Sequence, residues 1–287
     1  MKQLWVSLCF AFLLSLSQSA WAQVSEDALT EVALGRCFSR LEETIPIQIE
    51  FRHPERVIYP DWFKAPFFAK FETLDRASAL PVCEALLISL EAYPPKLLRQ
   101  NLRTVALFKK LVFYEQIYRA SYLYDPEQKR GDLMIATLSF REDLDIPLWV
   151  VDSFHHEFSS VLIQKYPFPE KAWRKANPSD FQYTLEAEDS PGVEALKKGF
   201  GTAEEEALLE MGFLSQYATA SFEEDLNFYA GQLFSVPAHL LELAQTYPVI
   251  GKKVKILLQF YLSLDAEFIK TAVFQKFAQA GMLEQGL

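Results

Sequence analysis

The sequence predicts an α+β fold that is mostly helical, with a small β-sheet before one central helix. Three observations lead to this prediction. Half of the residues are apolar, which is enough for a large core. Runs of β-type residues lie between residues 103 and 140. Apolar residues at helical spacing fill most of the chain from residue 222 to residue 280.

The composition excludes several classes of protein. Charged residues make up 23% of the chain and aromatic residues 14%, which disfavours a disordered or collagen-like chain. The formal net charge is −10. A nucleic-acid binder needs a basic face that releases counterions from phosphates, and this sequence supplies no such cluster of Lys and Arg. We therefore expect no nucleic-acid partner.

Residues 1–22 have the pattern of a secretory signal peptide. A charged start at Lys2 is followed by an apolar stretch, residues 4–16, and then by small residues. The apolar stretch is shorter than the ~20 residues that a membrane-spanning helix needs, and no later stretch is both that long and uncharged. We expect an exported protein, periplasmic or extracellular, that does not span the membrane and whose mature chain begins near Gln23.

The cysteine count predicts one disulfide. Cys9 lies in the predicted signal peptide, and lipoprotein-type cleavage before it would leave an apolar segment on the mature chain. Cys37 and Cys83 remain, and two thiols in an exported protein favour a bond between them. The alternative is two buried free cysteines, because both lie in apolar settings of helical type.

The first half of the chain mixes helices and strands. A segment rich in Pro, Trp and Phe reaches to about residue 71, and residues 96–101 predict a short turn. Residues 125–132, DPEQKRGD, have the composition of a turn, so the strands on either side should form a hairpin. The predicted helices cover residues 27–41 and 79–92, and the predicted strands cover 45–51, 103–113, 118–124 and 133–140.

The second half is predicted to be helical apart from one long connection. A helix over residues 152–165 has Asp152 as its expected N-cap and Pro167 beyond its end. Residues 166–201 contain several prolines and little periodicity, which is typical of a lid or a binding loop. Further helices are predicted over residues 222–234, 238–246, 250–262 and 266–280.

The segment 154–162, FHHEFSSVL, carries the most informative residues. In zinc metallopeptidases, H-E-x-x-H places two histidines one turn apart on one helix face, and the Glu acts as general base. His156 and Glu157 match the first His and the Glu, but Ser160 stands in place of the second His. Serine is a poor zinc ligand, so the usual chelate is broken.

A second segment, residues 212–231, reads GFLSQYATASFEEDLNFYAG. Together the two segments resemble the zinc-binding metallopeptidases of the gluzincin group, whose members look like the lethal-factor-like toxin peptidases in this region. In that family a HHEF-x-H-I-L helix is followed by a G-F-x-S-x-Y-A loop and an E-D-F-A-E helix. The resemblance covers most of residues 95–268 and implies a zincin-like fold.

The resemblance also implies a role for each matching residue. His156 matches the first zinc ligand, and Glu224 matches the third. Glu157 matches the general base, and Tyr217 matches the tyrosine that stabilises the oxyanion. In an intact site of this kind, zinc activates a water molecule for peptide hydrolysis.

Three positions depart from the family pattern. Ser160 replaces the second zinc ligand, and with one ligand lost we expect zinc to be held weakly. Asn227 and Phe228 stand where the family has Ala and Glu, so a carboxylate that would support the metal ligands is also missing.

The candidates for a substitute ligand are few, because the chain has four histidines. Asp152 lies four residues before His156 and would share its helix face, which would give a weaker, oxygen-rich metal site. His155 points about 100° away from His156. His53 and His239 could approach only through tertiary folding.

Each candidate residue also has a purely structural interpretation. The sequence Ser221-x-x-Glu224 is a capping box, in which the Glu224 carboxylate would return to the Ser221 backbone. Tyr217 could be a packed tyrosine with a satisfied hydroxyl. His156 and its neighbour His155 could be ordinary polar residues of a helix.

The sequence therefore predicts an exported metallopeptidase-like protein that hydrolyses peptide bonds at a divergent metal site. The alternative is a catalytically inactive homologue that binds a protein or another ligand. In both cases the expected partner is a peptide or a protein. We expect one domain, residues 23–287, with a sheet-containing lobe at 23–165, a helical lobe at 166–287 and the site between them. Serine-hydrolase chemistry is disfavoured because the nucleophile elbow is absent.

Overall fold

The computed structural model describes residues 31–41, 43, 47–137 and 145–283. The predicted signal peptide lies outside these residues, as do the last residues of the strand predicted over 133–140. Within the described residues, no helix combines the length and the apolar character that crossing a bilayer requires.

Six strands form one mixed sheet around the long strand β3 (Leu102–Phe113). The main order is β1 (Gln48–Glu50), β3, β6 (Arg130–Ala136) and β5 (Ala120–Asp125). β1 and β6 run parallel to the first half of β3, whereas β2 (Lys70–Thr73) and β4 (Gln116–Tyr118) pair antiparallel with its second half. β5 and β6 form the predicted antiparallel hairpin.

Alternation along β3 sends its side chains to two different cores. Val105 and Leu107 belong to the main core, whereas Ala106 and Phe108 belong to a second cluster on the opposite face of the sheet. The segment rich in Pro, Trp and Phe forms two short 3₁₀ helices, η1 (Pro54–Val57) and η2 (Pro60–Phe63), and its Ile58 and Ala69 belong to that second cluster. An irregular segment thus closes the face that the helices leave open.

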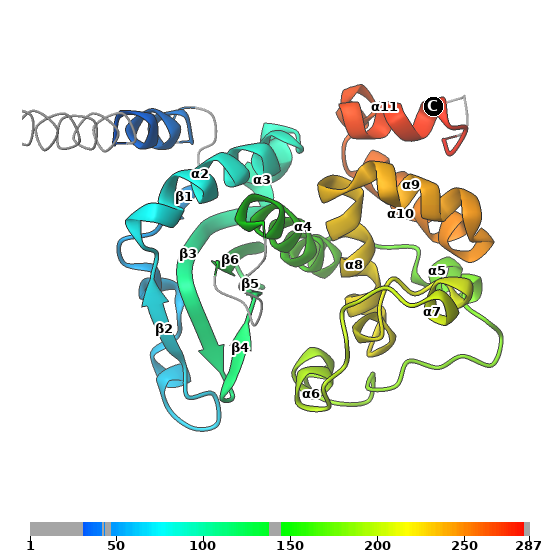
Figure 1. Ribbon diagram of the computed structural model, residues 1–287, viewed down its shortest axis with the longest axis horizontal. Coiled ribbons are helices and arrows are strands. Elements are labelled where there is room, and N and C mark those ends of the chain that lie inside the picture. Colours follow the sequence, from blue (N-terminus) through cyan, green and yellow to red (C-terminus); the bar gives the residue numbers. More distant parts are fainter. Residues whose placement is uncertain (1–30, 42, 44–46, 138–144, 284–287) are drawn as a thin grey trace, which may run out of the picture.

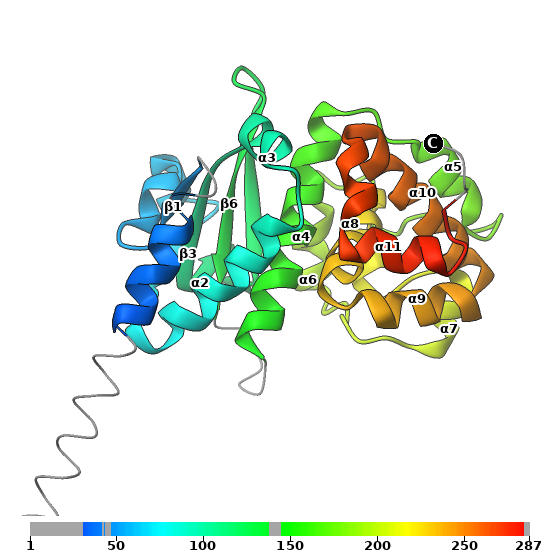
Figure 2. The same cartoon turned by 90° about the horizontal axis from the view of Figure 1, so that it is seen from above.

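Two helices cover the main-core face of the sheet. α2 (Arg76–Glu91) begins at Asp75, whose side chain accepts a hydrogen bond from the Ser78 amide, and it packs against α4 (Ile146–Lys165). Figure 2 shows α2 and α4 running over the strands. Residues 96–101, predicted as a turn, belong to the short helix α3 (Pro95–Asn101).

The start of α4 corrects one prediction. Asp152 does not cap the helix, because α4 begins at Ile146 with Asp145 as its N-cap, and the Asp145 side chain accepts from the Leu148 amide. Pro147 lies in the first turn, where a missing N–H group breaks no helical hydrogen bond. The earlier start places His156 and Glu157 in the middle of a long helix.

The remainder of the chain is helical and lies on the far side of α4 from the sheet (Figure 1). The helix predicted over 266–280 is interrupted, because Thr271 caps a new helix through the Phe274 amide. The long connection contains two short helices. The helices of this part are α5 (Glu170–Ala176), α6 (Pro191–Lys197), α7 (Glu206–Met211), α8 (Phe222–Ser235), α9 (Pro237–Thr246), α10 (Pro248–Leu264) and α11 (Ala272–Gln279), with the 3₁₀ helices η3 (Tyr217–Thr219) and η4 (Ala266–Lys270).

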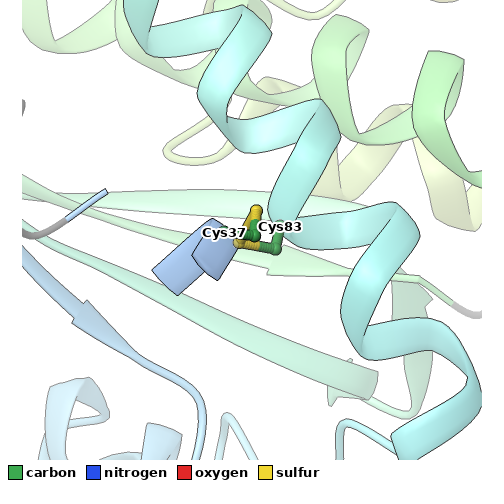
Figure 3. The surroundings of a disulfide bond; sticks show 2 residues. All are labelled: Cys37 and Cys83. Atoms are coloured by element: carbon green, nitrogen blue, oxygen red, sulfur yellow. A yellow bond between two sulfur atoms is a disulfide. The ribbon is translucent and has the colours of Figure 1, made fainter. Parts of the chain in front are cut away.

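The predicted disulfide between Cys37 and Cys83 is confirmed (Figure 3). It joins the helical residues 31–41 to α2, and the two Cα atoms are 6.2 Å apart. Both cysteines are buried in the main core. The bond closes a loop with a sequence separation of 46, so it restricts the unfolded chain considerably.

Removal of this bond should destabilise the protein. We expect Cys37→Ser to lower the free energy of unfolding by about 2–4 kcal/mol, because the unfolded chain regains the entropy of the opened loop. Urea unfolding of the oxidised wild type and of the variant measures the difference. Reduced wild-type protein should match the variant, and equal stability of the oxidised and reduced wild type would contradict the prediction.

Candidate functional site

The candidate residues come together where α8 crosses α4. His156 and Glu157 lie on α4, Glu224 lies in the first turn of α8, and Tyr217 lies on η3 just before it. The His156 Nε2 atom is 3.3 Å from Glu224 Oε2, and both side chains are mostly buried. The structure thus joins two segments that are far apart in the sequence.

The capping box at the start of α8 is only half formed. Ser221 caps the helix, since its Oγ accepts a hydrogen bond of 3.2 Å from the Glu224 amide. The Glu224 carboxylate turns away toward His156, and its Oε1 lies 3.4 Å from the Tyr217 hydroxyl. The carboxylate is therefore part of the site, whereas the backbone of the same residue belongs to the cap.

Tyr217 is a hydrogen-bond donor within this site. Its hydroxyl donates to the backbone carbonyl of Gly192 at 3.1 Å. Burial, together with the nearby carboxylates of Glu224 and Glu157, raises the pKa of Tyr217 well above its ordinary value. The phenol therefore keeps its proton at neutral pH.

Glu157 titrates near neutrality. Burial raises the pKa of Glu157 from 4.5 to about 7. The interactions of Glu157 with His156 and Arg119 oppose this shift, whereas the carboxylates of Glu224 and Glu223 add to it. A carboxyl group with this pKa can accept or donate a proton at neutral pH.

Asp152 is held by a guanidinium group. It lies one turn before His156 on α4 and forms an ion pair with Arg119, and its Oδ1 accepts from Ser235 Oγ at 3.3 Å. Arg119 also donates to Ser153 Oγ at 2.7 Å. To serve as a substitute metal ligand, Asp152 would have to give up this ion pair.

The other histidines are engaged elsewhere. His155 is buried in the core, where its Nδ1 is 2.8 Å from the Tyr93 hydroxyl, and burial lowers its pKa to about 3. His239 Nε2 is 2.9 Å from the Glu204 carboxylate, and His53 Nδ1 is 3.4 Å from Glu55 Oε1. The structure does not bring these side chains to His156.

Two of the three departures from the family pattern, Ser160 and Asn227, contact each other, and the third, Phe228, contacts His156. The Asn227 amide nitrogen donates to Ser160 Oγ at 2.8 Å, and the Asn227 amide oxygen accepts from Ser159 Oγ at 2.5 Å. The Phe228 ring packs against the His156 ring, with the ring centroids 5.6 Å apart. A hydrogen-bonded cluster of Ser159, Ser160 and Asn227 therefore lies where the resemblance would place the second zinc ligand.

Several residues of the site carry no signal in the sequence. Tyr118 and Arg119 come from β4 and the residue that follows it, and the Tyr118 hydroxyl is buried without a hydrogen-bond partner in the described part of the chain. Glu223 accepts from the Tyr122 hydroxyl at 2.8 Å, and burial raises the pKa of Glu223. Only the position of Glu223 beside Glu224 could have suggested a role for it.

A fully buried ion pair lies beside the site and fixes α8. Lys253 of α10 is 2.7 Å from the Asp225 carboxylate, and neither side chain is exposed. The same carboxylate oxygen accepts from Trp173 and Tyr183. Burial raises the pKa of Asp225 and lowers that of Lys253, while each charge opposes the shift of the other. The pair sets the position of α8, and so of Glu224.

The donor set does not fit a zinc ion. His156 and Glu224 supply two donors, but Ser160 supplies a hydroxyl that is already hydrogen-bonded. Over residues 31–41, 47–137 and 145–283, no three or more His, Cys, Asp or Glu side chains are arranged to hold a metal ion. We therefore derive no chemical step through zinc.

Glu157 should make the stability of the protein depend on pH. Its pKa is higher in the folded state than the ordinary 4.5, so ionisation favours unfolding as the pH rises from about 4.5 to 7. Glu157→Gln cannot ionise. The difference in the free energy of unfolding between this variant and the wild type should be smallest below pH 4.5. It should shift in favour of the variant by up to about 3 kcal/mol as the pH rises above 7. Urea unfolding between pH 4 and pH 8 measures this difference, with Glu84→Gln, a change at an exposed residue of α2, as control. A difference independent of pH would contradict the assignment.

Truncation of one partner of the buried ion pair should be costly. Lys253→Ala leaves Asp225 charged and buried, and we expect a loss of about 3–5 kcal/mol in the free energy of unfolding. The double variant Asp225→Leu with Lys253→Met should lose less, because it buries no charge. Chemical denaturation of both variants tests this, and a double variant that is less stable than Lys253→Ala would show that the pair itself is net stabilising.

Comparison with known proteins agrees with the resemblance seen in the sequence. A family model described as "Putative zinc-binding metallo-peptidase" matches residues 136–255, the segment that carries α4, Tyr217 and α8. No curated protein matches the chain.

The fold is similar to that of a solved structure. The crystal structure of a protein from Bacteroides caccae with the same description has 13% sequence identity to this chain and a TM-score of 0.52. The similarity covers 88% of this chain and 95% of that protein. The α+β, mostly helical fold is thus a metallopeptidase-like fold. The match over residues 136–255, which hold the candidate site, supports a relation to the zinc-binding metallopeptidase family.

Proposed function

We propose that this protein is an exported relative of the zinc metallopeptidases that binds a peptide or protein segment without hydrolysing it. The observation that carries this proposal is the hydrogen bonding of Ser160 to Asn227 at the place of the second zinc ligand. Both serines of the motif helix are satisfied by one amide on α8, so the substitution is built into the packing of the two helices.

The loss of one ligand has a large effect on zinc affinity. Catalytic zinc sites use three protein ligands and leave the fourth position to water. A neutral serine hydroxyl is a poor replacement for an imidazole. With His156 and Glu224 alone, the protein would hold zinc too weakly to retain it during purification.

The polar groups that remain suit a peptide. The Tyr217 hydroxyl is a donor for a backbone carbonyl, and the Glu224 carboxylate is an acceptor for a backbone N–H group. Glu157, whose pKa is raised to about 7, can serve as either. A peptide backbone offers both kinds of group, so these side chains can bind it without a metal.

A second candidate function is peptide hydrolysis with an unusual metal site. It is favoured by the spacing of 3.3 Å between His156 Nε2 and Glu224 Oε2, which is close to the spacing of about 3.4 Å expected for neighbouring ligands on a tetrahedral zinc ion. The same Glu224 oxygen is buried and makes no hydrogen bond within the described residues. This candidate requires a third donor, and Asp152 could supply it only by giving up its ion pair with Arg119.

Metal content separates the two candidates. The mature chain, residues 23–287, is purified without immobilised metals and measured by inductively coupled plasma mass spectrometry, with His156→Ala as control. A binding protein should contain well below one zinc per chain in both samples. Near-stoichiometric zinc that is lost in His156→Ala would overturn the proposal, and digestion of a peptide library would then define the activity.

Restoring the ligand should restore zinc binding. Ser160→His combined with Asn227→Ala removes the amide that bonds Ser160 and makes room for an imidazole beside His156 and Glu224. We expect the zinc affinity to rise by orders of magnitude, measured by competition with a chromophoric chelator. Asn227→Ala alone is the matched control. An unchanged affinity in the double variant would refute the assignment of His156 and Glu224 as remaining zinc ligands.

A further inference from the structure

Helix α6 lies directly against the candidate site. A Cβ atom on Gly192 would lie 2.2 Å from Glu224 Oε1 and 2.7 Å from the Tyr217 hydroxyl oxygen. The chain backbone can come this close to both side chains because residue 192 is glycine. The Gly192 carbonyl also accepts the Tyr217 hydrogen bond, so this backbone uses the donor of the site.

The other end of α6 reaches the sheet. Lys197 Nζ lies 5.6 Å from the centre of the Tyr114 ring, in the turn between β3 and β4. Figure 1 shows α6 between the end of β4 and the helices around α8. The helix therefore spans from Tyr217 and Glu224 to the tip of the sheet, across the site.

The contacts that hold α6 are few. Ala195 is fully buried, but it packs with Leu185 and Ala220 in a small cluster separate from the two larger cores. Phe200 and Tyr217 are partly buried against the same cluster. The free energy needed to open a segment with little buried apolar area is lower than the free energy of global unfolding, so α6 can open while the rest of the protein stays folded.

We propose that the segment from Ser190 to Lys197 is an autoinhibitory cover, which keeps the site around His156 and Glu224 closed and must move away before a ligand enters. In the closed state the Gly192 carbonyl accepts the hydrogen bond of the Tyr217 hydroxyl, which a ligand would otherwise use. This inference goes beyond the proposed function, because the cover would act in the same way whether the open site binds or cleaves its ligand.

The reactivity of His156 toward diethyl pyrocarbonate tests the cover. His156 has 15% of its side chain exposed, whereas His53 and His239, with 57% and 44%, serve as internal references in the same digest. Modification at each histidine is followed by peptide mass spectrometry. Hydrogen exchange of residues 190–198 reports in parallel whether the cover itself has opened.

Ala195→Asp should release the cover while leaving His156, Glu157 and Glu224 unchanged. Burial of an unpaired carboxylate in the small cluster should destabilise the closed state enough to raise the population of the open state at least about tenfold. The modification of His156 should therefore accelerate at least about tenfold relative to the references. Exchange of residues 190–198 should accelerate with it. Lys198→Ala, an exposed change at the residue directly after the cover that alters the net charge equally, should behave as the wild type.

Two results would overturn the proposal. One is faster exchange of residues 190–198 in Ala195→Asp with an unchanged modification rate at His156, since the segment would then not shield the site. The other is unchanged exchange in this segment. If exchange in α10 shows that Ala195→Asp unfolds globally, Lys197→Ala replaces it. Loss of the cation–π contact with Tyr114 should raise the His156 rate about two- to fivefold, and no change would reject the cover.

Discussion

The close packing of α4 between the sheet and α8 is the constraint on which the site depends. Glycines allow the approach on both sides. A Cβ on Gly131 of β6 would lie 2.4 Å from Val161 Cγ2 of α4, and a Cβ on Gly231 of α8 would lie 2.5 Å from Asp152 Oδ1. With α4 held this closely, His156 on one helix can face Glu224 on the other. A larger side chain at Gly231 would push α8 away from α4 and so separate the two halves of the site, whereas one at Gly131 would displace α4 from the sheet.

The same packing explains how the chain accommodates a serine at position 160, where the family pattern has a histidine. A serine at position 160 leaves both a smaller volume and a polar group at a buried crossing, and each would be costly by itself. Asn227 fills the volume and satisfies the hydroxyl groups of Ser159 and Ser160. Phe228 adds an apolar contact to His156. The contact between the two helices at this crossing thus rests on a cluster that needs only groups of the protein itself.

Much of the fold could be predicted from local patterns. The apolar periodicity of α8, α9 and α10 and the turn composition of residues 125–132 gave the correct elements, because these segments bury one regular face. The sequence does not mark the start of α4 clearly, because Asp152 also has the side chain of a cap. The true cap is Asp145, and Pro147, two residues later, suits a first turn. Nothing in the periodicity of residues 266–280 marks the break at Thr271.

The candidate site was only partly predictable for a related reason. His156, Glu157, Tyr217 and Glu224 stand in two short segments whose residue types and spacing carry information. Arg119, Tyr118 and Gly192 reach the site through tertiary folding, and neither their neighbours in the sequence nor their residue types indicate this. The pKa of Glu157 likewise depends on burial and on charges from α8, which spacing along one helix cannot supply.

The disulfide has a consequence for the durability of the folded chain. The loop that Cys37 and Cys83 close contains η1 and η2, the irregular segment that covers the outer face of the sheet. A protease that cut this segment once would break the polypeptide but not the covalent connection, since the helical residues 31–41 would stay attached to α2 through sulfur. The nicked molecule would keep its full mass until a reductant separated the two pieces.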